Sequence, residues 1–230
     1  MTPPVAPELL HSPPLLAWRL PAPRQALSSA PVGGGLAQVS WVLNAQVPSD
    51  YARTDLATHV AELAALHDLT GPGCGLLTAA HVAQWRRGAD GGVMADATVG
   101  VTRPTWAADA DDAISPWHAG TINIVIQLPV RLNEAALVGA VVTASEAKAQ
   151  ALREAGIPGT GTASDAVCVL CPTGGPAEPF AGPRSLWGSR LARAVHAAVQ
   201  AGMTPSTPRR ESAGVGNTSA GSLREDGATS

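Results

Sequence analysis

Residues 159–165 read Gly-Thr-Gly-Thr-Ala-Ser-Asp, a run of small and hydroxyl side chains that ends in a carboxylate. The apolar stretch 166–171 follows at once, so we expect Asp165 to lie where a turn enters a strand. A carboxylate at that point can act as a general base, while backbone N–H groups of the turn and the hydroxyls of Thr160 and Thr162 can stabilise an oxyanion. A base and oxyanion donors are groups that hydrolytic chemistry in general requires. A turn stabilised by Asp and Thr side chains is the structural alternative.

A second pair of candidate catalytic residues, Lys148 and Glu146, lies in segment 134–155, which is predicted to be a helix capped by Asn133. At 100° per residue, Lys148 falls near the centre of the apolar stripe and Glu146 almost opposite it. A lysine in such a stripe must extend to solvent, find an anion or lose its proton. We therefore expect Lys148 on the interior side and Glu146 away from it. A solvent-reaching lysine and a solvated surface carboxylate are the alternatives.

Polar residues at strand ends form a third group, which we interpret as substrate-binding. Asn44 ends one predicted strand, and Asn123 follows Thr121 at the start of another. Their amide groups can hydrogen-bond a polar ligand, and Gly34 and Gly35 can let a ligand approach the backbone closely. Strand-end turns explain the asparagines equally well, and an ordinary flexible turn explains the glycines.

The elements that would position these residues alternate in type along the chain. This alternation predicts a mixed α/β (α+β) fold, a single layered domain at 15–203 with helices packed on a mixed sheet. The Pro-rich segment 1–14 and the Ser/Thr/Gly-rich tail 204–230 are predicted to be disordered. The predicted strands are 36–43, 93–101, 122–128 and 166–171, and the predicted helices are 55–67, 79–87, 134–155 and 186–201.

Six polar or Gly-rich blocks, taken together and in order, carry a family resemblance that spans roughly residues 18–203. They are 28–36, 76–80 (Leu-Leu-Thr-Ala-Ala), 120–124 (Gly-Thr-Ile-Asn-Ile), 145–148 (Ser-Glu-Ala-Lys), 159–165 and 181–188. The chain resembles the adenosylcobinamide amidohydrolases, enzymes of corrinoid salvage. The last block departs from that family's pattern, because Pro183-Arg184-Ser185 and Ser189 stand where a His-Thr pair and an acidic residue are expected.

The resemblance implies hydrolysis of the amide that joins aminopropanol to the corrin ring of adenosylcobinamide, with release of adenosylcobyric acid. It implies that the cobalt belongs to the substrate, so that no separate cofactor is expected. It also strengthens the case for the Glu146–Lys148 block, beside Asp165 and Thr162, as catalytic. A corrinoid-binding or delivery protein without hydrolysis and an amidohydrolase of complete cobamides remain the alternatives.

Composition bounds the remaining possibilities. A formal net charge of −3 and a pI near 6.0 give no electrostatic reason to expect a nucleic-acid partner. The sequence has no apolar run long enough for a membrane span and no signal-peptide pattern, so a cytoplasmic location is expected. Three cysteines make no disulfide framework, and Cys168 and Cys171, three apart on one strand, point to opposite faces. We expect no metal site, and the oligomeric state stays open.

Overall fold

A large mixed sheet dominates residues 3–110 and 120–203, the parts of the chain that the computed structural model describes. Its eight strands run in the order β4-β3-β2-β9-β7-β6-β5, with β1 paired to β2. The strands are β1 (Glu8–His11), β2 (Pro14–Ser28), β3 (Gly35–Gln46), β4 (Gly73–Thr78), β5 (Arg86–Asp90), β6 (Val93–Gly100), β7 (Thr121–Gln127) and β9 (Ala166–Pro172). A small second sheet pairs β8 (Arg131–Leu132) with β10 (Ala177–Glu178).

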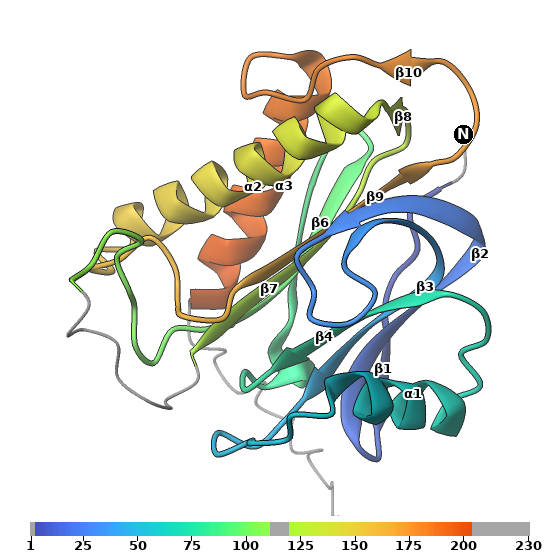
Figure 1. Cartoon of the computed structure of the whole chain (residues 1–230). Coiled ribbons are helices and arrows are strands. Elements are labelled where there is room, and N and C mark those ends of the chain that lie inside the picture. The colour runs from blue at the N-terminus through green and yellow to red at the C-terminus, as the bar shows by residue number, and fades with distance from the viewer. Residues whose placement is uncertain (1–2, 111–119, 204–230) are drawn as a thin grey trace, which may run out of the picture.

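The long strand β2 lets the sheet fold over on itself. Its register shifts between Arg19 and Arg24, and only the part after that shift pairs with β9. Trp18, before the shift, packs instead in a core cluster with Val125 of β7 and Cys168 of β9. The curved β2 and β3 therefore pass over the β9-β7-β6 half of the sheet, as Figure 1 shows.

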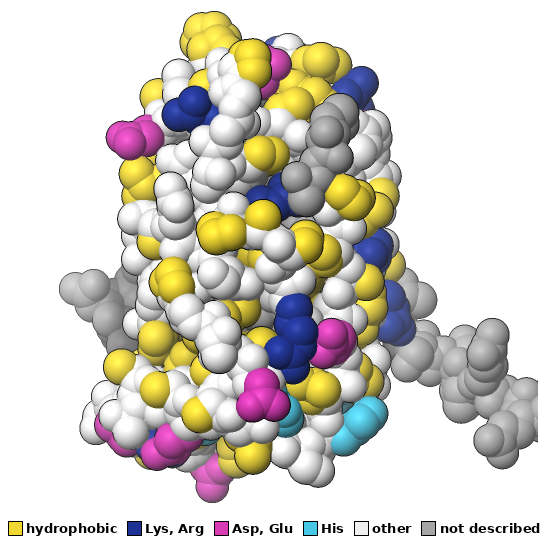
Figure 2. Space-filling model, turned by 90° about the vertical axis from the view of Figure 1, so that its right-hand side faces the viewer, with side chains coloured by type: hydrophobic (Ala, Val, Ile, Leu, Met, Phe, Trp, Pro, Cys, Tyr) yellow, Lys and Arg dark blue, Asp and Glu magenta, His cyan; other side chains and the backbone are white. Residues whose placement is uncertain are grey.

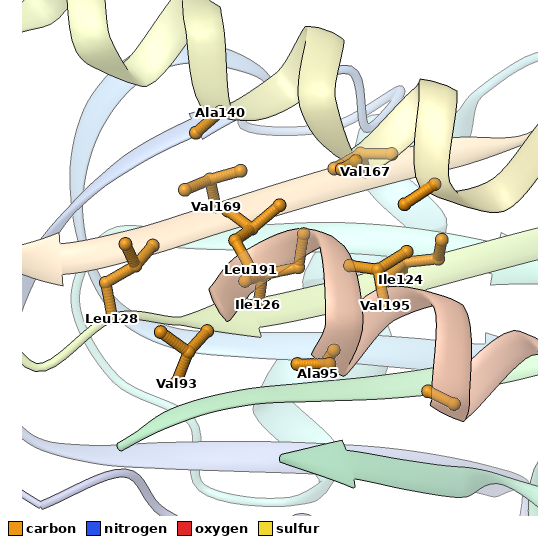
Figure 3. Close-up of a cluster of buried hydrophobic side chains, with 14 of the residues drawn as sticks. Val93, Ala95, Ile124, Ile126, Leu128, Ala140, Val167, Val169, Leu191 and Val195 are labelled. Atoms are coloured by element: carbon orange, nitrogen blue, oxygen red, sulfur yellow. The ribbon is translucent and has the colours of Figure 1, made fainter. Parts of the chain in front are cut away.

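The central strand β7 is buried along its whole length, and its two faces enter different cores. Ile122, Ile124 and Ile126 pack in the larger core cluster, whereas Val125 packs in the cluster of Trp18. Figure 3 shows Ile124 and Ile126 in this larger cluster. The alternation read from the sequence is thus confirmed, because successive side chains of a strand point to opposite faces. Asn123, on the face opposite the isoleucines, is also buried.

The helices α2 (Glu134–Glu154) and α3 (Leu186–Met203) pack together over the isoleucine face, and α1 (Leu56–Leu66) packs near β3 (Figure 1). Asn133 caps α2 as predicted, because its side chain accepts a 2.7 Å hydrogen bond from the Ala136 N–H. The helix ends before Gly156, whose φ of +73° suits glycine. The predicted fold class, a mixed α/β fold in one domain, is confirmed.

Two predicted segments differ in the structure. The helix expected over 79–87 is wrong: a short 3₁₀ helix (Val82–Gln84) is followed by β5, where Arg87 pairs with Asp96 of β6. The segment 1–14, expected to be disordered, forms β1 because Leu9 and Leu10 pair with the start of β2. In both cases, hydrogen-bonded pairing with a neighbouring strand overrides the preference of the local composition. The predicted disordered tail 204–230 lies outside the described residues.

Candidate active site

The carboxylate of Asp165 is the centre of a hydrogen-bonded cluster at the ends of β7, β9 and α2. Its Oδ2 accepts from the ammonium of Lys148 and from the Thr162 N–H at 3.1 Å. Its Oδ1 accepts from the Ile122 N–H at 2.9 Å and lies 2.5 Å from the Thr162 hydroxyl. An ionised carboxylate offers about four lone-pair sites, so this one is fully engaged. The predicted inward orientation of Lys148 is confirmed, since its side chain is only 13% exposed.

The Thr162 hydroxyl has two acceptors and one proton. Its Oγ1 lies 2.7 Å from the Gly120 carbonyl oxygen and 2.5 Å from Asp165 Oδ1. When the proton points at Gly120, Asp165 Oδ1 loses one of its donors and a proton-accepting site becomes free. Thr162 can therefore switch Asp165 between a fully bonded state and a basic one.

Gly161 has no side chain for a reason that the cluster makes clear. A Cβ atom at this position would overlap the Asp165 carboxylate and lie 2.6 Å from Lys148 Nζ. The backbone of the turn is thus packed directly against the ion pair. The Gly-Thr-Gly-Thr run of the sequence is the local signal for this close approach.

A cavity of about 440 Å³ opens beside Asp165, between the ends of the central strands and the loop that follows β3. Thr121, Ser164 and Asp165 line it from the β7 and β9 side. Lys148 and Thr162 are not among its lining residues, so they reach the cavity only through Asp165. The other lining residues are Ser29, Pro31, Val47, Pro48, Ser49, Tyr51, Arg53, Leu56, Leu77, Thr78, Ala79 and Ala166.

Ser164 is the most informative residue that the sequence interpretation missed. Its Oγ lies 2.9 Å from Thr121 Oγ1 and donates to the Gly120 carbonyl at 3.2 Å. This places two hydroxyls next to the Asp165 carboxylate on the cavity wall. Its position directly before Asp165 in the polar run was the available signal.

The loop after β3 brings Tyr51 and Arg53 to the cavity, and nothing local in the sequence indicated this. The Tyr51 hydroxyl lies 2.7 Å from His59 Nδ1 on α1. Arg53 donates to Asp55 at 2.6 Å and to Glu62 at 3.0 Å, and its guanidinium lowers the pKa of Asp55 to about 2. The positive charge of Arg53 is therefore matched by carboxylates.

Asn44 and Asn123 meet inside the fold rather than on the cavity wall. Asn123 Nδ2 donates to Asn44 Oδ1 and to the Leu77 carbonyl, both at 2.9 Å, and Asn44 Nδ2 donates to Thr98 Oγ1 at 3.0 Å. Both side chains are about 1% exposed. The pair links the two folded-over halves of the sheet beneath the cavity. Their predicted contact with substrate stays a prediction that this placement does not support.

Four further predicted residues are not brought to the cavity. Glu146 is exposed on the outer face of α2, and Thr160 accepts from the Ala107 N–H in the neighbouring loop. Gly34 lies directly before β3, and Gly35, with a φ of +82°, is the first residue of that strand. The cluster of Asp165, Lys148 and Thr162, with Thr121 on the wall, is the part of the predicted site that the fold assembles.

The predicted oxyanion role of the 159–161 turn meets a similar difficulty. Gly159 N–H donates to the Ile157 carbonyl and Thr160 N–H to the Thr105 carbonyl, at 3.0 and 2.9 Å. Donors already engaged in this way do not point at a ligand. The hydroxyls of Thr121 and Ser164 are also hydrogen-bonded, but they line the cavity and a hydroxyl proton can rotate toward a ligand, which a backbone N–H cannot do.

The cysteines occupy the positions that their spacing predicted. Cys168 packs in the Trp18 cluster and Cys171 in the cluster under α2 and α3, on opposite faces of β9. Burial raises the pKa of the Cys171 thiol. Within residues 3–110 and 120–203, His, Cys, Asp and Glu side chains form no group able to hold a metal ion.

Charged side chains of both signs lie on the molecular surface. On the face shown in Figure 2, acidic and histidine side chains gather at the lower end, and basic side chains lie scattered above them. None of the described helices is long and apolar enough to cross a membrane.

A carboxylate with an ammonium partner and neighbouring hydroxyls, next to a cavity on a mixed α/β fold, is an arrangement that can support the proton transfers of a hydrolase. Comparison of the sequence with known proteins identifies the family to which the chain belongs. The adenosylcobinamide amidohydrolase family profile matches residues 5–211. An adenosylcobinamide amidohydrolase of Methanosarcina mazei is 33% identical over 184 residues, which cover 76% of this chain and 88% of the relative. A second relative of that name, from Halobacterium salinarum, is 37% identical over 119 residues, which cover 49% and 51% of the two chains. The chain belongs to the adenosylcobinamide amidohydrolase family.

Proposed function

We propose that the protein hydrolyses the aminopropanol amide of adenosylcobinamide and releases adenosylcobyric acid for corrinoid salvage. The names of the relatives support the substrate, and the Lys148–Asp165–Thr162 cluster beside the cavity supports the chemistry. That cluster is the observation that carries the proposal. The cobalt ion belongs to the corrinoid substrate, and the reaction as proposed requires no other cofactor.

The size of the cavity indicates which part of the substrate enters it. At about 440 Å³ it lies at the lower end of the range for small-molecule sites. A corrin macrocycle with its fringe of amide arms is larger than such a cavity. We therefore place the aminopropanol arm and its amide beside Asp165, with the macrocycle outside against the rim.

The residues around this amide have distinct roles in the proposal. Asp165 takes a proton from the attacking water once the Thr162 hydroxyl turns to Gly120. Thr121 and Ser164 donate hydrogen bonds to the carbonyl oxygen as it gains negative charge. Lys148, behind Asp165, balances the charge of the carboxylate and fixes its orientation.

Incubation of the purified protein with adenosylcobinamide, followed by chromatography with mass detection, tests the proposal. Adenosylcobyric acid and free aminopropanol are the expected products. Binding of the coloured substrate without cleavage would indicate a corrinoid-binding protein, and cleavage of complete cobamides alone would shift the substrate. Neither binding nor cleavage of any corrinoid would contradict the proposal.

The departures at Arg184 and Ser189 bear on these alternatives. Arg184 lies in the turn just before α3 and Ser189 in its first turn, where Ser185 Oγ accepts from the Gly188 N–H at 3.1 Å. Neither residue lines the cavity beside Asp165. The replacements therefore leave the proposed reaction centre intact.

A further inference from the structure

Lys148 is the single lysine of this chain, among 14 arginines. It is also largely buried, and its ammonium donates to Asp165, the one carboxylate among the described residues that line the cavity. Arginine keeps its proton under all ordinary conditions, whereas lysine can release one. A chain that uses arginine at every other cationic position thus has, behind its candidate catalytic carboxylate, a cation able to give up a proton.

We propose that Lys148 is a proton carrier for the reaction, working through Asp165, and more than a fixed counter-charge. This role rests on the proposed amide hydrolysis. Lys148 does not line the cavity, so it acts as a positioning and proton-relay residue and not as a group that touches substrate.

The proton balance of amide hydrolysis shows why a second carrier is useful. Water forms a C–O bond to the carbonyl carbon, the C–N bond breaks, and the nitrogen gains two protons to leave as an ammonium ion. Both protons come from the water, one at attack and one when the new carboxylic acid ionises. Asp165 can hold only one proton at a time.

The geometry provides the path for the other proton. Lys148 Nζ passes a proton to Asp165 Oδ2 while Asp165 protonates the leaving nitrogen, and Lys148 regains it by the same route when the new carboxylic acid ionises. Thr162 Oγ1 lies within hydrogen-bonding distance of both Asp165 Oδ1 and the Gly120 carbonyl oxygen, so its proton can turn to either one. Gly161 packs directly against the pair, because a Cβ atom there would lie 2.6 Å from Lys148 Nζ.

The Lys148→Arg variant separates charge from proton transfer, because arginine keeps the charge. We expect KM for adenosylcobinamide to stay unchanged and kcat to fall roughly a hundredfold or more. The reverse exchange on the exposed side of α2, Arg153→Lys, is the matched control and should leave kcat unaltered. A Lys148→Arg enzyme with the wild-type kcat would overturn the role.

A second variant covers the case in which arginine does not fit beneath Gly161. Lys148→Ala opens space for a small amine, so methylammonium should restore kcat in proportion to its concentration. Tetramethylammonium, which has the charge but no transferable proton, should not. Equal rescue by both ions, or by neither in a folded variant, would overturn the proton role. Absence of turnover by the wild-type protein would instead contradict the proposed hydrolysis itself.

Discussion

Two buried aspartates in this protein have similar partners and different surroundings. Asp165 is paired with Lys148 and lines a cavity, and its side chain is 10% exposed. Asp96, on β6, is paired with Arg87, accepts a 3.0 Å bond from Trp18 Nε1, and is 1% exposed. Each is a carboxylate with a cationic partner and further hydrogen bonds, yet only one can meet a substrate.

The way each cation binds explains the difference. Arg87 forms two bonds to Asp96, Nε to Oδ1 at 2.7 Å and Nη2 to Oδ2 at 2.8 Å, and this planar fork fixes the carboxylate. The carboxylate in turn raises the pKa of Arg87. Asp165 is instead held by a point-like ammonium and by a hydroxyl with a second acceptor. The Arg87–Asp96 pair therefore links β5 to β6, whereas the Lys148–Asp165–Thr162 cluster keeps protons that can be transferred.

The largest effect expected from this comparison is on activity, in Asp165→Asn. The amide cannot accept a proton from water, so kcat should fall about 10²–10⁴-fold. Circular dichroism should show a folded protein, since the position borders a cavity that solvent can enter. Asp68→Asn, the same exchange at an exposed residue, is the control, and full activity in Asp165→Asn would remove Asp165 as the base.

Asp96→Asn should have the reverse profile, with stability lost and chemistry kept. Removal of one charge leaves Arg87 partly buried without its partner, which costs on the order of 3–5 kcal/mol of unfolding free energy. Urea unfolding measures this loss, and kcat per folded molecule should match the wild type. In the exposed Asp90–Arg193 pair, Asp90→Asn should lower the stability far less, because solvent screens such a pair. A selective loss of kcat in Asp96→Asn would contradict the structural role.

Asn44→Leu tests whether the asparagine pair has a structural role, like Asp96, or a role in the active site, like Asp165. The variant leaves the Asn123 amide and the Thr98 hydroxyl short of a buried partner, so we expect a loss of about 1–3 kcal/mol. KM for adenosylcobinamide should not change, because Asn44 does not line the cavity. A rise in KM without a loss of stability would restore the substrate-binding interpretation.

The smallest effect is expected for Glu146→Gln. Glu146 is exposed on α2, so both the unfolding free energy, within about 0.5 kcal/mol, and kcat should match the wild type. A large fall in kcat would show that the outer face of α2 takes part in catalysis, and Glu146 would then have to be included in the active site.

The elements with strong local patterns were predictable. The alternation of β7, the Asn133 cap and the inward face of Lys148 follow from spacing alone, as does the division of Cys168 and Cys171 between the two faces of β9. The elements β1, β2, β4 and β5 were not predicted. β2 and β4 pair with strands more distant in sequence, such as Ala26 with Leu170 and Gly75 with Leu43, and β1 and β5 pair with the adjacent strands β2 and β6; local composition does not encode such pairing.

For the site, the sequence by itself determined the reactive groups: a carboxylate after a Gly-Thr run, one lysine on an apolar helix stripe, and the polar blocks of one family. Only the tertiary structure decided which of these groups meet. It placed Lys148 and Thr162 on Asp165, left Glu146 outside, buried Asn44 against Asn123, and added Ser164 and Tyr51 to the cavity. Periodicity fixes the direction of a side chain within its own element. The fold-over of the sheet at β2 sets which elements face one another, and long-range packing alone decides that.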